Sequence, residues 1–78
     1  MKTDCTIKFN SIEEYREIEK TLEELGYEND KEWNEDYLKD LGKLKKLYVH
    51  IDGFLFGVYS FHEPQYKIYN SLNDFLND

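Results

Sequence analysis

The sequence has little of what catalysis and metal binding usually require. It contains one cysteine and two histidines, and no pair of them has the spacing of zinc ligands. The motifs GxxxxGK[ST], GxGxxG, HExxH and GxSxG are absent. The acidic residues form neither a calcium loop nor a recognisable pair of catalytic carboxylates. An enzyme is therefore the least supported class, and we expect no catalytic residues, no metal and no cofactor.

Long apolar runs are also missing. The longest uncharged stretch, Gly53 to His62, is too short to span a bilayer, which takes about 20 apolar residues. No segment combines a charged start, an apolar run and a small-residue cleavage site, so we expect no secretory signal. With a lone cysteine, no intrachain disulfide can form. These absences predict a cytoplasmic protein that does not bind membranes, and the length predicts a single domain, residues 1–78.

Positive charge is scarce and unevenly placed. The chain has 17 acidic and 10 basic residues, a formal net charge of −7. Residues 1–42 carry 13 acids and 6 bases, whereas residues 43–78 carry 4 of each. Direct nucleic-acid binding is disfavoured because it needs clustered Lys and Arg to neutralise phosphates. The charge favours a partner protein with a basic surface.

The first 27 residues predict a strand followed by a helix. Residues 5–9 alternate, with Cys5, Ile7 and Phe9 on one face. Ser11 followed by Glu14 has the pattern of a capping box, and Gly26 has the position of a C-terminal glycine in a Schellman motif. The helix between them carries one apolar stripe, made of Ile12, Tyr15, Ile18, Leu22 and Leu25.

Residues 28–45 allow two interpretations. An otherwise polar segment has apolar residues at the spacing of a helix of about two turns, ending near Gly42: Trp33, Tyr37, Leu38 and Leu41. An ordered loop held by Trp33 fits the same pattern equally.

Residues 46–61 predict a β-hairpin. Asp52-Gly53 between two β-rich runs is typical of a type I′ turn. This turn predicts three apolar pairs on one face, namely Ile51 with Phe54, Val49 with Phe56, and Leu47 with Val58. The other face then carries Tyr48, His50, Leu55, Gly57, Tyr59 and Phe61.

The C-terminal segment completes the predicted fold. Pro64 ends the hairpin, residues 66–69 suit a third antiparallel strand, and Ser71 with Asp74 caps a short helix containing Leu72, Phe75 and Leu76. The expected order is β-α-(α)-β-β-β-α. We predict an α+β, two-layer fold with a small, mostly antiparallel sheet and the N-terminal helix packed on one face.

Two surfaces are candidates for binding a partner. The second face of the hairpin carries Tyr48, His50 and Tyr59; it is either covered by the other helices or exposed as a protein interface that also allows a homodimer. His50 is either a half-exposed strand residue or a polar group of that interface. The polar face of the first helix carries Glu13, Glu17 and Glu24, and is either a solvated surface or a phosphate-like docking surface. Cys5, on the inward face of its strand, is expected to be buried and inert.

The segment 7–15 contains S-I-E-E-Y at residues 11–15, and residues 22–27 have the sequence L-E-E-L-G-Y. Both segments resemble small phage and prophage proteins of low-GC bacteria. The resemblance implies a mobile-element setting, in which small acidic proteins inhibit host defence or nucleic-acid enzymes, as anti-CRISPR proteins do. It implies no catalytic residues.

The function expected from the sequence is inhibition of a host protein by direct contact in the bacterial cytoplasm. Two alternatives stay open: an immunity protein or antitoxin that caps a toxin, and an oligomeric small-molecule sponge or sensor. An acidic inhibitor on a basic nuclease works by similar physics, so the sequence does not separate the first alternative from the main interpretation.

Overall fold

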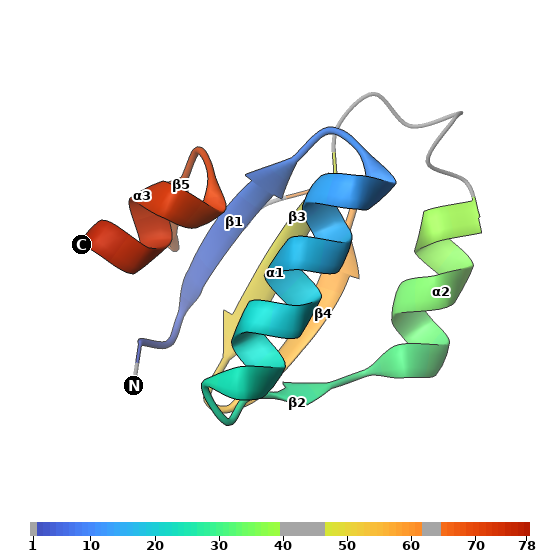
Figure 1. Ribbon diagram of the computed structural model, residues 1–78, viewed down its shortest axis with the longest axis horizontal. Helices are drawn as coiled ribbons and strands as arrows, with labels where there is room; N and C mark the ends of the chain where they lie inside the picture. The colour runs from blue at the N-terminus through green and yellow to red at the C-terminus, as the bar shows by residue number, and fades with distance from the viewer. Residues whose placement is uncertain (1, 40–46, 62–64) are drawn as a thin grey trace.

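The computed structural model describes residues 2–39, 47–61 and 65–78, which form one five-stranded sheet and three helices. The strands are β1 (Cys5–Phe9), β2 (Glu28–Asn29), β3 (Leu47–Asp52), β4 (Leu55–Tyr59) and β5 (Lys67–Tyr69); the helices are α1 (Ile12–Glu24), α2 (Lys31–Lys39) and α3 (Leu72–Asn77). The strand order is β2-β4-β3-β1-β5. In Figure 1, α1 crosses one face of the sheet, α2 lies beside the β4 edge and α3 lies beside β1 and β5. The predicted α+β, two-layer class is confirmed.

The N-terminus of α1 is capped as the sequence predicts. The Ser11 hydroxyl accepts a hydrogen bond from the backbone N–H of Glu14 at 3.2 Å. The Glu14 carboxylate accepts from the N–H of Asn10 at 2.8 Å, one residue earlier than in a standard capping box. Tyr15 and Ile18 lie in the core beneath the helix, so the capped end is held against the sheet.

A Schellman motif ends α1. The N–H of Tyr27 donates to the carbonyl of Leu22 at 3.0 Å, and the N–H of Gly26 donates to the carbonyl of Glu23 at 3.1 Å. Gly26 has a φ of +99°, which suits glycine. In the predicted apolar stripe, Tyr15, Ile18 and Leu22 are buried and Ile12 is partly buried, whereas Leu25 is the C-cap residue and is 49% exposed.

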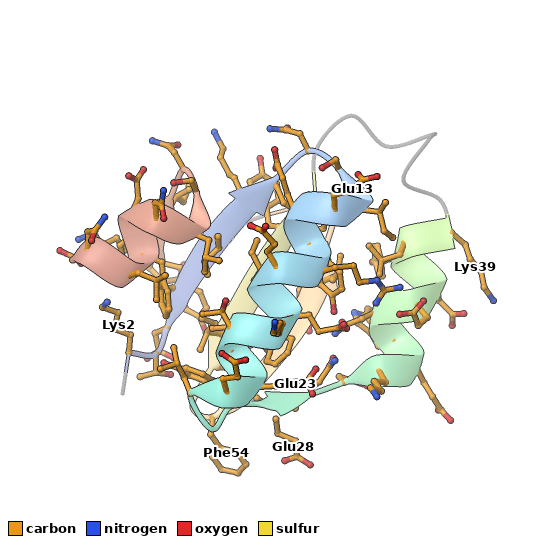
Figure 2. The ribbon with its side chains drawn as sticks, in the orientation of Figure 1. Lys2, Glu13, Glu23, Glu28, Lys39 and Phe54 are labelled. Carbon is orange, nitrogen blue, oxygen red and sulfur yellow. The ribbon has the colours of Figure 1, made fainter. Side chains whose placement is uncertain are left out.

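The turn between β3 and β4 differs from the predicted one. Asp52 pairs with Leu55, so the two loop residues are Gly53 and Phe54. Only Gly53 has a positive φ, of +63°, which excludes a type I′ turn and matches the glycine-first pattern of type II′. Phe54, predicted to be in the core, therefore lies in the turn and is 61% exposed; Figure 2 shows it pointing away from the sheet.

The hairpin register is consequently shifted by two residues. Val49 opposes Val58, and Ile51 opposes Phe56, so the predicted pairing of Val49 with Phe56 is wrong. Side chains alternate with a period of two, so a shift of two leaves the apolar face intact. All four side chains are fully buried.

The two edge strands were not predicted correctly. β5 pairs in parallel with β1, with Ile7 opposite Tyr69, instead of extending an antiparallel meander. The outer edge of β4 is already occupied by β2 and α2, which leaves the outer edge of β1 for β5. β2 is a two-residue strand inside the segment that was predicted as helix or loop. The helical interpretation of that segment is confirmed by α2, whereas Gly42, His62 and Pro64 lie outside the described residues.

Candidate protein interaction surface

The outer edge of β4 is completed by two side chains of α2. The backbone N–H of Val58 donates to Oδ1 of Asn34 at 2.8 Å, and the carbonyl of Val58 accepts from Nε1 of Trp33 at 2.9 Å. An unpaired strand edge is a template for aggregation, so these side chains satisfy it where β2 has ended. They also fix α2 against the sheet.

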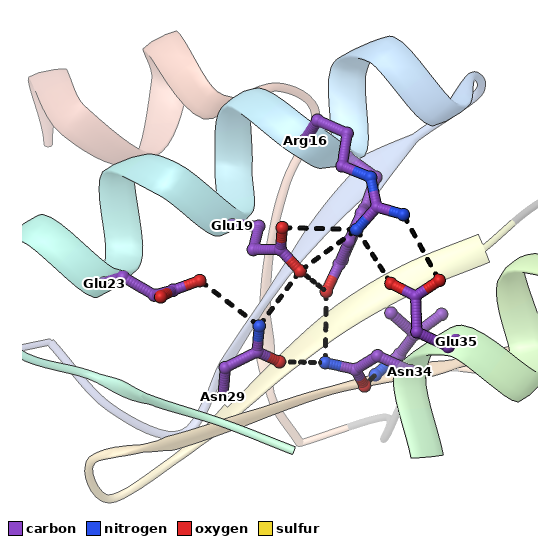
Figure 3. A network of polar contacts seen from close by, with 8 residues as sticks. Arg16, Glu19, Glu23, Asn29, Asn34 and Glu35 are labelled. Carbon is purple, nitrogen blue, oxygen red and sulfur yellow. Dashed lines mark hydrogen bonds and ion pairs between the residues drawn. The ribbon is translucent and has the colours of Figure 1, made fainter. Parts of the chain in front are cut away.

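Asn34 is the centre of a buried polar network, shown in Figure 3. It has no exposed surface, and Nδ2 donates to the Tyr15 hydroxyl at 3.1 Å and to Oδ1 of Asn29 at 2.6 Å. The Tyr15 hydroxyl in turn donates to Glu19 at 3.0 Å. Burial, and then the Glu19 carboxylate, raise the pKa of Tyr15. The network joins α1, β2, α2 and β4 through groups whose hydrogen bonds are all made (Figure 3).

Arg16 connects the two longer helices at the surface. Its guanidinium donates to both carboxylate oxygens of Glu35, at 2.8 and 3.2 Å, and to Glu19 at 3.2 Å. The hydrogen bond from Arg16 lowers the pKa of Glu35. Because both side chains of the Arg16–Glu35 pair are nearly half exposed, solvent screens it, and its contribution to stability is small. Its main consequence is to orient α2 relative to α1.

An aromatic cluster extends from α2 across β4 on the face opposite α1. We define it by the side chains of Trp33, Tyr37, Tyr59 and Phe61. Ring centroids lie 5.1 Å apart for Trp33 and Tyr37, 5.9 Å for Trp33 and Tyr59, and 5.5 Å for Tyr59 and Phe61. Trp33 is 42% exposed and Phe61 is 51% exposed, so the cluster presents ring surface to solvent. Exposed aromatic surface of this kind is typical of protein interfaces.

His50 and Tyr48 lie deeper than the sequence suggested. His50 is only 3% exposed, which contradicts the half-exposed interpretation, and Tyr48 is also buried. The His50 ring packs 4.5 Å from the Tyr59 ring, and its Nε2 lies 2.8 Å from the carbonyl of Phe61. A carbonyl only accepts, so Nε2 carries the hydrogen. Of the three candidate residues on this face, Tyr59 alone is partly accessible.

The acidic ridge consists of Glu13, Glu17 and Glu24 on the outer face of α1, and all three side chains are exposed. Within the described residues none of them has an ion-pair or hydrogen-bond partner. Residues 12–39 contain 11 acids and 4 bases, net −7, which equals the formal charge of the whole chain. The excess negative charge therefore belongs to α1, β2 and α2, with Glu13 near the start of α1 and Glu28 in β2 (Figure 2).

Cys5 is buried in the core, as predicted, and burial raises its pKa to about 11. A thiol that stays protonated is a poor nucleophile and a poor metal ligand. Across residues 2–39, 47–61 and 65–78, no group of three or more His, Cys, Asp or Glu side chains is placed to hold a metal ion.

Sequence reasoning missed Asn34, and it considered Trp33 as an apolar residue of the helix or as the anchor of a loop, not as a binding residue. One feature of the sequence points to Asn34: it precedes Tyr37, Leu38 and Leu41 by three, four and seven residues, so a polar residue occupies an apolar row. Phe61 was placed correctly on the second face of the hairpin, with the other aromatic residues there, but was not among the candidate binding residues.

Among the helices that the structure describes, none is long and apolar enough to cross a membrane. Comparisons of the chain with protein-family models, with curated proteins and with solved structures found no match.

Proposed function

We propose that this chain is a small, non-enzymatic inhibitor carried by a phage or mobile element, and that it blocks a host protein with a basic, nucleic-acid-binding surface by direct contact. The observation that carries the proposal is the placement of charge. The entire net charge of −7 lies in residues 12–39, and the acidic ridge has no partner among the described residues.

The ridge is a rigid row of negative charge. Glu13 and Glu17 are one helical turn apart, about 6 Å along the axis, and Glu24 is about 10 Å further on. The opposite face of α1 is locked into the core by Tyr15, Ile18 and Leu22, so binding need not order the helix. A basic surface that binds the regularly spaced phosphates of a nucleic acid can bind a row of carboxylates in the same way.

Most of the ridge does not serve the stability of its own helix; only Glu13, in the first turn, interacts favourably with the helix dipole. Like charges four residues apart, such as Glu13 and Glu17, destabilise a helix by about 0.2–0.5 kcal/mol per pair. Lys20 lies three residues from Glu17 and four from Glu24, yet it forms no ion pair with either among the described residues. Charge retained at a cost to the helix supports a role in association, where it increases the rate of encounter.

Two variants of equal charge test this proposal. The ridge variant replaces Glu13, Glu17 and Glu24 by Gln, and the control variant replaces the exposed residues Gln65, Asn70 and Asn77 by Lys; each raises the net charge by three. Wild-type protein is immobilised and used to capture proteins from a lysate of a low-GC bacterium, and bound protein is eluted with double-stranded DNA. We expect a basic protein that the wild type and the control variant retain, that DNA displaces and that the ridge variant loses. Equal capture by the ridge variant, or a captured protein that DNA does not displace, would refute the proposal.

A further inference from the structure

Trp33 is a partly exposed side chain whose orientation is fixed by a hydrogen bond. Its Nε1 donates to the carbonyl of Val58 at 2.9 Å, while 42% of the residue stays accessible. The rings of Tyr37 and Tyr59 flank the indole at 5.1 and 5.9 Å. The indole, fixed by this hydrogen bond and packed against the two tyrosine rings, forms with them a platform, and a fixed indole loses little side-chain entropy when a ligand binds to it.

Gly57 makes room for this arrangement. A Cβ atom at that position would lie 3.7 Å from Cδ1 of Trp33 and 3.5 Å from Cε2 of Tyr59. These are ordinary contacts, so alanine would fit, but a longer side chain would displace the rings. The platform therefore rests directly on the backbone of β4.

The charge around the platform is negative. Asp36 lies one helical turn from Trp33. Its carboxylate is 3.8 Å from the ammonium group of Lys39, and because both side chains are exposed, solvent screens this ion pair. On the other side, burial raises the pKa of Tyr59, and the nearby carboxylates of Asp52 and Asp30 raise it further. The carboxylates of Asp52 and Asp30 thus act on Tyr59, and Asp36 lies on the helix that carries Trp33 and Tyr37.

We propose that this platform, formed by Trp33, Tyr37 and Tyr59, binds an arginine side chain of a basic partner protein. This inference rests on the function proposed above and specifies the partner's chemistry. A guanidinium stacks on aromatic faces and is weakly hydrated, whereas a Lys ammonium is a strongly hydrated point charge. A second copy of the chain is a poor source of the arginine, because its one arginine, Arg16, is already engaged with Glu19 and Glu35.

Two peptides of equal length and charge provide the test: hexa-arginine and hexa-lysine, both with blocked ends. Trp33 is the only tryptophan, so its fluorescence reports on the platform, and calorimetry gives the affinity. Contact of the guanidinium with two of these exposed rings predicts at least about fivefold tighter binding of hexa-arginine. Only hexa-arginine should quench Trp33 strongly, because only the guanidinium stacks on the ring.

Three variants locate the preference. Trp33→Leu should reduce the preference to about twofold or less while hexa-lysine binding persists. Tyr37→Leu keeps the hydrogen bond from Trp33 to the carbonyl of Val58, so it tests the platform even if Trp33→Leu fails to fold. It should reduce the preference for hexa-arginine about twofold. Phe54→Ser removes an exposed ring at the β3–β4 turn and should leave the preference unchanged.

The outcomes separate this inference from the proposed function. Equal affinity for both peptides in the wild type, with binding that the ridge variant weakens, would overturn the arginine site alone. If neither hexa-arginine nor hexa-lysine binds, both proposals are overturned. A preference that survives undiminished in both Trp33→Leu and Tyr37→Leu, or a wild-type dimer in which Trp33 becomes buried, would also overturn the arginine site.

Discussion

Replacing Asn34 with Asp exchanges the amide NH2 group for a carboxylate oxygen in the middle of the buried network. The side chain keeps its shape, and its Oδ1 can still accept from the N–H of Val58. It loses the amide hydrogens that bind the Tyr15 hydroxyl and Oδ1 of Asn29, and a carboxylate oxygen then faces both of those oxygens. No cation among the described residues is hydrogen-bonded to Asn34.

The expected loss is comparable to the whole stability of the domain. Two lost hydrogen bonds account for about 1 kcal/mol each. An unpaired charge in a site with no exposed surface adds about 3 kcal/mol or more. A domain of 78 residues has a free energy of unfolding of roughly 4–12 kcal/mol. A loss of about 5 kcal/mol would lower Tm by at least roughly 20 °C or abolish folding at pH 7.

The loss should depend on pH. Burial raises the folded-state pKa of the introduced carboxyl above its value of about 3.9 in the unfolded chain. The part of the destabilisation that comes from the charge is therefore complete above the raised pKa and disappears as pH falls below the unfolded value, whereas a protonated carboxyl still lacks one of the two amide hydrogens. Thermal and urea unfolding of variant and wild type at pH 7 and pH 4.5 measure this, and the difference between them should shrink at pH 4.5.

Asn73→Asp is the matched control, because it adds the same charge at an exposed position in the first turn of α3. We expect a change within about 0.5 kcal/mol. If Asn34→Asp melts within a few degrees of the wild type at pH 7, the amide of Asn34 does not hold α2 to α1 and the network is not as described.

Three further predictions concern other parts of the chain. Arg16→Gln should cost less than about 1 kcal/mol because the Arg16–Glu35 pair is nearly half exposed; since the pair lowers the pKa of Glu35, the difference from wild type in urea unfolding should be present above the unfolded pKa of about 4.3 and be lost as pH falls through the lowered pKa of Glu35. Cys5, with a pKa raised to about 11, should react with a thiol reagent at pH 8 only after unfolding, and rapid labelling of the native protein would contradict its burial. The sequence suggested a homodimer through Tyr48, His50 and Tyr59, but the first two are buried, so sedimentation at micromolar concentration should give a monomer near 9.5 kDa; twice that mass would restore the dimer.

The features predicted correctly from the sequence are those that neighbouring residues determine. Ser11 and Ser71 cap their helices by accepting from the N–H three residues on, and Gly26 ends α1, because each motif lies within a few positions along the chain. The faces of β3 and β4 were also correct, since alternation survives a shift of two residues.

The features that were missed depend on distant contacts or on a choice between similar local structures. Gly53 suits both a type I′ and a type II′ turn, and the hairpin uses the second, which moves Phe54 out of the core. The parallel pairing of β5 with β1 depends on which sheet edge is free. Asn34 looks like a surface residue by type, and its burial follows only from the groups that meet it: Tyr15, Asn29 and Val58.

The measurement that tests the proposed function most directly is the association rate with the captured basic protein, by stopped-flow fluorescence of Trp33 at 0.05 M and 0.5 M salt. Wild type and control variant should associate at rates within about twofold of each other. The ridge variant should be about tenfold slower at low salt, and the difference should shrink at high salt because the Debye length falls severalfold. If all three proteins associate at the same rate at low salt, the acidic ridge is only a solvated surface and does not bind the partner.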